Sequence, residues 1–308
     1  MKKYMKWGTA ALGAAAAGVA GGAWYAYNEA FRADEKRIAD MREIPQEDWA
    51  YRERSLKNID ALVDTPFERV SIQSRDGLTL RGKFYAGRRE APLLLFFHGY
   101  RSTAERDGSG GFSICREKGW KAMMADQRGH GESEGKTITF GVKERFDVLD
   151  WINWAVKRFG EEQDIYLVGI SMGAATVLMA AGEGLPPQVK GIWADCGYSS
   201  PEAVLRHTIR TRRLPEGAGW FVTRLGARLF GGFDPREATA LDAVARIKIP
   251  VLIIHGQNDG MVPHEMGAEL SEACGGQVEF LSVPGAHHGL SFYADNAAYR
   301  AAVERLIK

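Results

Sequence analysis

The chain has 308 residues, of which 45% are hydrophobic and 26% are charged, a composition typical of a globular protein rather than a disordered one. Its 40 basic and 39 acidic residues leave a formal net charge of +1, so no overall charge excess points to nucleic acid as a partner. Cys115, Cys196 and Cys274 are too few for a disulfide framework and lack C-x-x-C spacing, so each is interpreted as a small buried hydrophobe.

The first 28 residues contain a long uncharged run that follows Lys2, Lys3 and Lys6. This run, over residues 7–28, is long enough to cross a bilayer as a helix and carries aromatic residues near both ends. We therefore expect residues 1–28 to be a signal anchor or transmembrane helix. Because the lysines precede the run, the rest of a membrane-anchored chain would lie outside the cytoplasm. The alternatives are a cleaved signal peptide on a secreted protein and a soluble Ala-rich helix on a cytoplasmic one.

Residues 29–68 are polar and charged, with apolar side chains that recur at helical spacing. The recurring residues include Ile38, Met41, Trp49, Leu56, Ile59 and Leu62. This pattern predicts a helical arm of one or two helices, interrupted at Pro45, that packs against the domain that follows.

The remaining residues, 69–308, alternate between strand and helix patterns. Apolar and polar residues alternate over 69–75 and 78–85, and Asp76-Gly77 between them predicts an antiparallel hairpin. Six further strands are predicted over 92–98, 120–125, 164–170, 189–194, 251–255 and 278–283. Helices are predicted over 139–159, 172–181, 263–274 and 293–307. This alternation predicts a mostly parallel, eight-stranded α/β sheet with helices on both faces, which binds ligands beyond the carboxyl ends of its strands.

The junction of the strand over 164–170 and the helix over 172–181 carries the motif G-x-S-x-G, as GISMG over 169–173. In this context a serine stands on a sharp strand-to-helix turn, and the glycines keep other side chains away from it. The N–H groups that begin the helix face the place where an oxyanion would develop. The motif therefore indicates that Ser171 is a nucleophile.

A serine hydroxyl is a weak nucleophile, so it needs a base, and the base needs an acid that orients it. In this architecture the acid and the base are expected in loops after later strands, in the order Ser, Asp or Glu, His. Asp259 follows the strand over 251–255, and His288 follows the strand over 278–283. Both residues therefore stand where the chemistry needs them.

Five motifs occur in one order along the chain. They are His98-Gly99-Tyr100, the run DQRGHGES over 126–133, the GISMG turn, the loop with Asp259, and His288-Gly289. In this set and order the chain resembles the α/β-hydrolase superfamily and, more narrowly, the bacterial serine esterases related to the prolyl-oligopeptidase-like hydrolases. The resemblance covers about residues 69–308. It implies an α/β-hydrolase fold with a helical cap between strands 6 and 7.

The resemblance also implies a role for each residue of the site. Ser171 would be the nucleophile, His288 the general base and acid, and Asp259 the residue that orients His288. The backbone amides of Tyr100 and Met172 would form the oxyanion hole.

Neighbouring residues offer alternatives at two of these positions. His287 stands beside His288, but the family pattern places the catalytic histidine directly before a glycine. Asn258 stands beside Asp259, but it lacks the charge that would stabilise an imidazolium. The remaining alternative acids are Asp195 and Asp242.

The segment over about 197–249 is too long for a plain connection, and we predict a helical cap that covers Ser171 and turns apolar residues toward the pocket. Within it, Arg206, Arg210, Arg212 and Arg213 form a basic run. The run is interpreted as a solvated helix face. The alternative is a contact with anionic lipid or with an acidic substrate.

These features together predict a serine hydrolase that acts on a small-molecule ester or acyl substrate, most simply a carboxylic ester, through an acyl-enzyme. A thioesterase or lactonase would use the same residues, a peptidase of the prolyl-oligopeptidase type would need a gating segment, and a non-catalytic binding protein would not need the complete Ser, Asp, His order. The chain has no H-E-x-x-H motif and no carboxylate cluster, so neither metal nor other cofactor is predicted. His98 and His130 are interpreted as structural.

Overall fold

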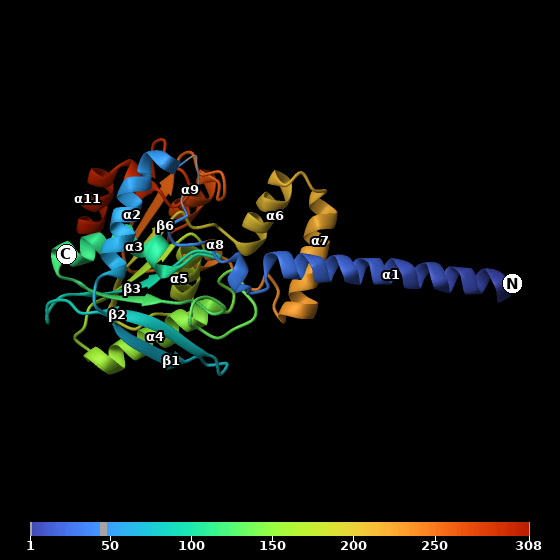
Figure 1. Ribbon diagram of the computed structural model, residues 1–308, viewed down its shortest axis with the longest axis horizontal. Coiled ribbons are helices and arrows are strands. Elements are labelled where there is room, and N and C mark those ends of the chain that lie inside the picture. The colour runs from blue at the N-terminus through green and yellow to red at the C-terminus, as the bar shows by residue number, and fades with distance from the viewer. Residues whose placement is uncertain (1, 44–47, 308) are drawn as a thin grey trace.

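An eight-stranded sheet forms the centre of the protein (Figure 1). The computed structural model describes residues 2–43 and 48–307, with side chains from residue 16 onward. The strands are β1 (Glu68–Gln73), β2 (Thr79–Tyr85), β3 (Leu93–Phe97), β4 (Lys121–Ala125), β5 (Ile165–Ile170), β6 (Val189–Asp195), β7 (Val251–Gly256) and β8 (Val278–Val283). Their order across the sheet is β1-β2-β4-β3-β5-β6-β7-β8.

The sheet is antiparallel at one edge and parallel elsewhere. Strand β2 runs antiparallel to both β1 and β4, and all pairings from β3 to β8 are parallel. A tight turn joins β1 to β2, where the N–H of Ser74 donates to the carbonyl of Leu78 at 2.9 Å. Gly77 adopts a φ of +88° in this turn, a value that suits a residue without a side chain. The predicted hairpin and the mostly parallel α/β-hydrolase sheet are therefore confirmed.

Helices cover both faces of the sheet, because successive side chains of a strand point to opposite faces. In β3, Leu93, Leu95 and Phe97 pack in the cluster that includes α4 and α5, whereas Leu94 and Phe96 pack in the cluster that includes α3 and α11. The helices of this α/β domain are α3 (Ala104–Lys118), α4 (Glu144–Phe159), α5 (Met172–Gly182), α9 (His264–Glu272), α10 (Ser291–Ala294) and α11 (Asn296–Leu306).

The N-terminal helix α1 (Lys2–Ala30) packs against α7 (Glu216–Gly226) and extends away from the sheet domain (Figure 1). The contact is close, since a Cβ at Gly226 would lie 2.3 Å from the carbonyl oxygen of Ala23. The predicted signal anchor or transmembrane helix is wrong, because no helix among the described residues is long and apolar enough to cross a membrane. The run consists mainly of Ala and Gly, whose small side chains present little apolar surface. The predicted membrane localisation and the possible membrane partner are corrected for the same reason.

The described parts of the arm predicted over 29–68 include the short turn η1 (Glu35–Arg37) and the helix α2 (Trp49–Val63). Helix α2 packs against α3, and its Ile59 and Leu62 are buried. The interruption predicted at Pro45 lies outside the described residues.

Between β6 and β7 the chain forms α6 (Pro201–Thr211), α7, η3 (Ala227–Gly231) and α8 (Ala240–Val244), in the segment where the sequence predicts a cap. Two arginines of the basic run have carboxylate partners within this segment. Arg206 lies 2.8 Å from Glu202 and 3.0 Å from Glu216, and Arg210 lies 3.2 Å from Glu216. Their charges are therefore partly compensated locally.

Candidate active site

Ser171 stands on a sharp turn between β5 and α5, with a φ of +56° and a ψ of −116°. Such a backbone conformation costs a residue with a side chain about 1–3 kcal/mol, and it persists only where its surroundings hold it. Here the N–H of Ser171 donates to the carbonyl of Asp195 at 2.8 Å. The motif needs both glycines, because a Cβ at Gly169 would lie 2.3 Å from the carbonyl oxygen of Gly173, and one at Gly173 would lie 1.9 Å from that of Phe97.

Two side chains from later loops complete a chain of hydrogen bonds with Ser171. Nε2 of His288, in the loop after β8, lies 2.8 Å from Oγ of Ser171. Nδ1 of the same ring lies 2.7 Å from Oδ2 of Asp259, in the loop after β7. The other carboxylate oxygen of Asp259 accepts the N–H groups of Met261 and Val262 at 2.9 and 2.8 Å. The hydroxyl, the imidazole and the carboxylate are thus joined in sequence.

The alternative residues have other partners. His287 turns toward the N-terminal arm, where its Nδ1 lies 3.0 Å from the carboxylate of Asp48. Asp242 is exposed and bonds to Thr239 at the start of α8. Asn258 lines the pocket beside Ser171.

Asp195, the last residue of β6, is buried and bonds to a hydroxyl rather than to an imidazole. Its Oδ2 accepts from the hydroxyl of Tyr299 at 2.8 Å, and that hydroxyl accepts the indole N–H of Trp193 at 3.1 Å. The other oxygen, Oδ1, has no hydrogen-bond partner among the described residues. Burial raises the pKa of Asp195 to about 6, although the bond from Tyr299 acts in the opposite direction.

The surroundings of Asp259 and His288 favour an ionised carboxylate beside a basic imidazole. Burial acts to raise the pKa of Asp259, but His288, His255 and the N–H of Val262 outweigh it and hold this pKa well below its usual range. Burial also acts to lower the pKa of His288, but Cys196 and Asp259 outweigh it and raise this pKa well above its usual value. An imidazole with high proton affinity can accept the proton of a hydroxyl.

The loop after β3 lies directly against the serine. A Cβ at Gly99 would be 3.2 Å from Cβ of Ser171. Asp107, in the first turn of α3, holds this loop by accepting the N–H of Gly99 and the hydroxyl of Ser102, each at 2.6 Å. No sequence motif points to Asp107, whose one signal is its place as an acidic residue in the first turn of a helix.

The two amides assigned to the oxyanion hole flank this loop and the elbow. Tyr100 follows Gly99, and Met172 is the first residue of α5. Neither amide has a hydrogen-bond acceptor among the described residues. Both donors are therefore free for an oxygen atom of a substrate.

Two buried histidines join the loop after β3 to the loop after β4. Nε2 of His98 accepts the N–H of Gln127 at 3.2 Å, and Nε2 of His130 accepts the N–H of Arg101 at 3.0 Å. Burial lowers the pKa of His98 to about 4 and that of His130 to about 3, so both rings are neutral at neutral pH. A neutral ring can accept these N–H groups, which gives both residues a structural role.

The end of α1 is also tied to this loop. The hydroxyl of Tyr100 donates to the carbonyl of Ala30 at 3.0 Å, and the guanidinium of Arg101 donates to the carbonyl of Glu29 at 2.8 Å. The last carbonyl groups of a helix lack partners within the helix, so the two side chains satisfy groups that α1 leaves free. The helix predicted to enter a membrane thus ends against the active-site loop.

A pocket of ≈ 520 Å³ opens at Ser171 and His288. Helix α2 forms one wall of it through Ser55 and Ile59, and Leu290 contributes further apolar surface. None of the described lining residues comes from 197–249, so the prediction that this segment turns apolar residues toward the pocket is wrong. That segment approaches the site at the Asp259 loop instead. There, Nε2 of His207 in α6 donates to the carbonyl of Gly260 at 3.2 Å.

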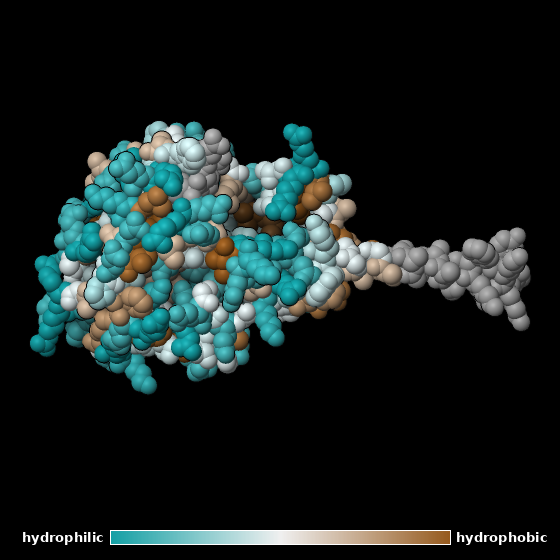
Figure 2. Space-filling view, viewed as in Figure 1, coloured by the Kyte–Doolittle hydropathy of each residue, from teal (hydrophilic) through white to brown (hydrophobic). Residues whose placement is uncertain are grey.

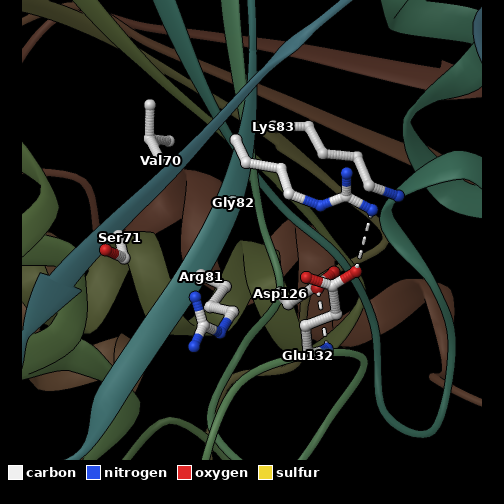
Figure 3. A pocket seen from close by; sticks show the side chains of 8 residues that line it. Val70, Ser71, Arg81, Gly82, Lys83, Asp126 and Glu132 are labelled. Atoms are coloured by element: carbon white, nitrogen blue, oxygen red, sulfur yellow. Dashed lines mark hydrogen bonds and ion pairs between the residues drawn. The ribbon is translucent and has the colours of Figure 1, made fainter.

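Another hollow, of ≈ 50 Å³, lies at the edge formed by β1 and β2 (Figure 3). Arg69 and Glu132 form an ion pair there at 3.4 Å, and Asp126 accepts the N–H of Glu132 at 3.0 Å. Burial raises the pKa of Asp126 to about 6. Pockets for small organic ligands have volumes of about 300–1,000 Å³, so this hollow is too small for an organic substrate.

The comparisons with known proteins agree with this fold. A family model described as alpha/beta hydrolase fold matches residues 92–214, and one described as Serine hydrolase (FSH1) matches residues 224–288. The chain therefore has the α/β-hydrolase fold. These matches do not confirm the narrower relation to the prolyl-oligopeptidase-like hydrolases.

Individual proteins are similar over most of the hydrolase domain. The esterase Pf2001 of Pyrococcus furiosus has a TM-score of 0.65 at 23% identity, over 81% of this chain and 92% of that one. YqkD of Bacillus subtilis is 28% identical over 61% of this chain. The match covers 62% of YqkD, which is less than two thirds of its length. The bifunctional esterase/perhydrolase DCH of Acinetobacter calcoaceticus is 22% identical over 71% of this chain and 92% of DCH.

Proposed function

We propose that this protein is a serine hydrolase that cleaves carboxylic esters of small molecules through an acyl-enzyme. The observation that carries the proposal is the hydrogen-bonded chain from Ser171 through His288 to Asp259, with contacts of 2.8 and 2.7 Å. It is supported by the similarity to two proteins named as esterases and by the match to a serine hydrolase family model.

In the first half-reaction, Oγ of Ser171 attacks the acyl carbon while Nε2 of His288 takes the hydroxyl proton. The carbonyl oxygen becomes an oxyanion, to which the amides of Tyr100 and Met172 donate. His288 then gives its proton to the leaving alcohol, and the acyl group stays on Ser171. Asp259 stabilises the imidazolium throughout and does not itself take the proton.

In the second half-reaction, a water molecule attacks the acyl-enzyme. His288 takes a proton from this water and returns one to Oγ of Ser171, which releases the carboxylic acid. Each amide of the oxyanion hole contributes about 3 kcal/mol to the stabilisation of both tetrahedral states.

The pocket gives the substrate a mixed environment. Ile59, Ile170 and Leu290 offer apolar surface to an acyl or alcohol group, and polar side chains such as Asn258 line the same space. Its volume of ≈ 520 Å³ falls in the range of about 300–1,000 Å³ that suits small-molecule ligands. We propose that α2 is the wall that selects the substrate and that 197–249 acts as a cap over the Asp259 loop.

The alternatives differ in the bond that is cleaved. Thioesters and lactones would react through the same residues, a peptidase would cleave amides, and a non-catalytic binding protein would cleave nothing. A fluorophosphonate probe should label the wild type at Ser171 and should not label Ser171→Ala. Hydrolysis of p-nitrophenyl esters of increasing acyl length should exceed that of aminoacyl anilides, thioesters and lactones. Labelling that persists in Ser171→Ala, or faster cleavage of anilides, would overturn the proposal.

A further inference from the structure

Cys196, interpreted from the sequence as a small hydrophobe, lies beside His288 and Asp259. It comes directly after β6, and its N–H donates to the carbonyl of Ile254 at 2.8 Å, which fixes the backbone. The ligand atoms of Cys196, Asp259 and His288 all lie within 4.8 Å of one another. Among the described residues, these three are the group whose types and closeness could hold a metal ion.

The three groups are of the kinds that Zn²⁺ takes: one sulfur, one imidazole nitrogen and one carboxylate oxygen. Zinc bonds of about 2.0–2.3 Å at tetrahedral angles place such ligand atoms about 3.5 Å apart. The three ligand atoms lie at most 4.8 Å apart, and Nδ1 of His288 lies 2.7 Å from Oδ2 of Asp259, so these separations need to change by about 1 Å to suit Zn²⁺.

We propose that Cys196, Asp259 and His288 form a binding site for a thiophilic divalent cation such as Zn²⁺, and that the bound cation inhibits hydrolysis. Binding forms a metal–sulfur bond and breaks the S–H bond of Cys196, whose proton passes to water. The cation loses bound water, and no electron is transferred. The thiolate and the carboxylate then balance its two positive charges.

Access and burial both suit such a site. The side chain of His288 is 17% exposed and lines the pocket, whereas the carboxylate of Asp259 is fully buried. A cation that enters from the pocket meets the imidazole first and the buried thiol and carboxylate behind it. In that low-dielectric place it is attracted by both anions more strongly than in water.

Inhibition follows from the atoms that the cation occupies. A cation on Nε2 takes the lone pair that would accept the proton of Ser171. A cation on Nδ1 replaces the hydrogen bond to Asp259 that orients the ring. Mg²⁺ and Ca²⁺ prefer oxygen ligands, so they should not compete for a site that includes a sulfur. The inhibition rests on the proposed function, but the binding does not.

The first test measures p-nitrophenyl ester hydrolysis against increasing Zn²⁺ in a non-chelating buffer. Each variant is compared with its own metal-free rate. Cys196→Ala should raise the half-inhibitory Zn²⁺ concentration at least tenfold relative to wild type, and Cys274→Ala should not. Chelation with EDTA should restore activity, and Mg²⁺ should have no effect. Equal inhibition of wild type and Cys196→Ala would overturn the proposal.

The second test detects binding without activity. Cd²⁺ bound to a thiolate gives an ultraviolet charge-transfer band, which should appear in wild type, Ser171→Ala and Cys274→Ala. The band should be absent from Cys196→Ser, which keeps the size of the side chain, provided that circular dichroism shows it folded. A band of equal strength in Cys196→Ser would refute the site. Activity that persists in Ser171→Ala, with the band unchanged, would refute the proposed function alone.

Discussion

Two regions of the protein meet at the pocket and reach it by different means. Ser171, Asp259 and His288 each lie shortly after the carboxyl end of a parallel strand, so the sheet itself brings them together. The N-terminal helices reach the same place from outside the sheet. Helix α2 packs against α3, and side-chain contacts such as His287 with Asp48 join its start to the pocket. The near face over α2 and α3 is mainly hydrophilic (Figure 2).

This difference indicates which substitutions should abolish hydrolysis and which should only change its rate. The parts that take up protons and negative charge are attached to strand ends, where packing leaves little freedom. At the pocket, the N-terminal arm contributes side-chain contacts that single substitutions can remove. We therefore expect large effects on rate from the strand-end residues and small effects from the arm.

The largest effect should come from Ser171. Ser171→Ala should lower kcat for an ester roughly 10⁶-fold, because the nucleophile is lost and only binding and the oxyanion amides remain. Ser171→Gly should be equally inactive, but its unfolding free energy should exceed that of wild type by about 1 kcal/mol, since glycine adopts a positive φ without strain. Steady-state kinetics and chemical denaturation measure the two effects. Wild-type rates in either variant would contradict the role of Ser171 as the nucleophile.

The choice of acid gives the next largest effect. Asp259→Asn should lower kcat about 10⁴-fold, because an amide cannot stabilise the imidazolium. Asp195→Asn is the matched control, since it removes a buried carboxylate that bonds to Tyr299 instead of to the imidazole. It should lower kcat less than tenfold. A larger loss in Asp195→Asn than in Asp259→Asn would reverse the assignment.

The pH profile should show the raised pKa of His288. The ring acts as base only when it is neutral, so kcat/KM should rise with pH through the His288 pKa, with a midpoint above the ordinary value of 6.5. Asp259→Asn removes a charge that favours the imidazolium and should move the midpoint to lower pH. A rate profile of wild type and variant checks this. A wild-type midpoint at or below the ordinary value would count against it.

The loop after β3 should have an intermediate effect. Asp107→Ala frees the N–H of Gly99 and the hydroxyl of Ser102, so the amide of Tyr100 is held less firmly. We expect kcat to fall about 10-fold to 100-fold, less than the 10²- to 10³-fold cost of losing an oxyanion donor, with KM little changed. A change confined to KM would show that Asp107 acts on binding instead.

The smallest effect should come from the arm. Asp48→Ala removes the partner of His287 and should cost about 0.5–1.5 kcal/mol of unfolding free energy. Asp60→Ala is the matched control, because its ion pair with Arg42 is exposed and should contribute under about 1 kcal/mol. Thermal denaturation compares the two. In Asp48→Ala, kcat for short esters should change less than about fivefold. A loss as large as that of Asp259→Asn would contradict the expected difference between the strand-end residues and the arm.

Sequence patterns were sufficient for the parts governed by local geometry. The alternation in β1 and β2 and the continuous apolar run of β3 follow from side-chain burial on two faces, so the sheet was predictable. The GISMG turn was predictable because close approach at Gly169 and Gly173 excludes side chains. The same patterns were misleading for α1, where a long uncharged run was interpreted as membrane-spanning although it is rich in small residues.

Local sequence patterns were enough to show which residues follow which strands, and this placed Ser171, Asp259 and His288 at the carboxyl ends of parallel strands. Contacts between distant segments placed α2 at the pocket, Asp107 against the loop beside the serine, and Cys196 near the imidazole. The physical reason is distance along the chain. Backbone geometry acts between neighbours, whereas these contacts join loops that meet only after the sheet has formed.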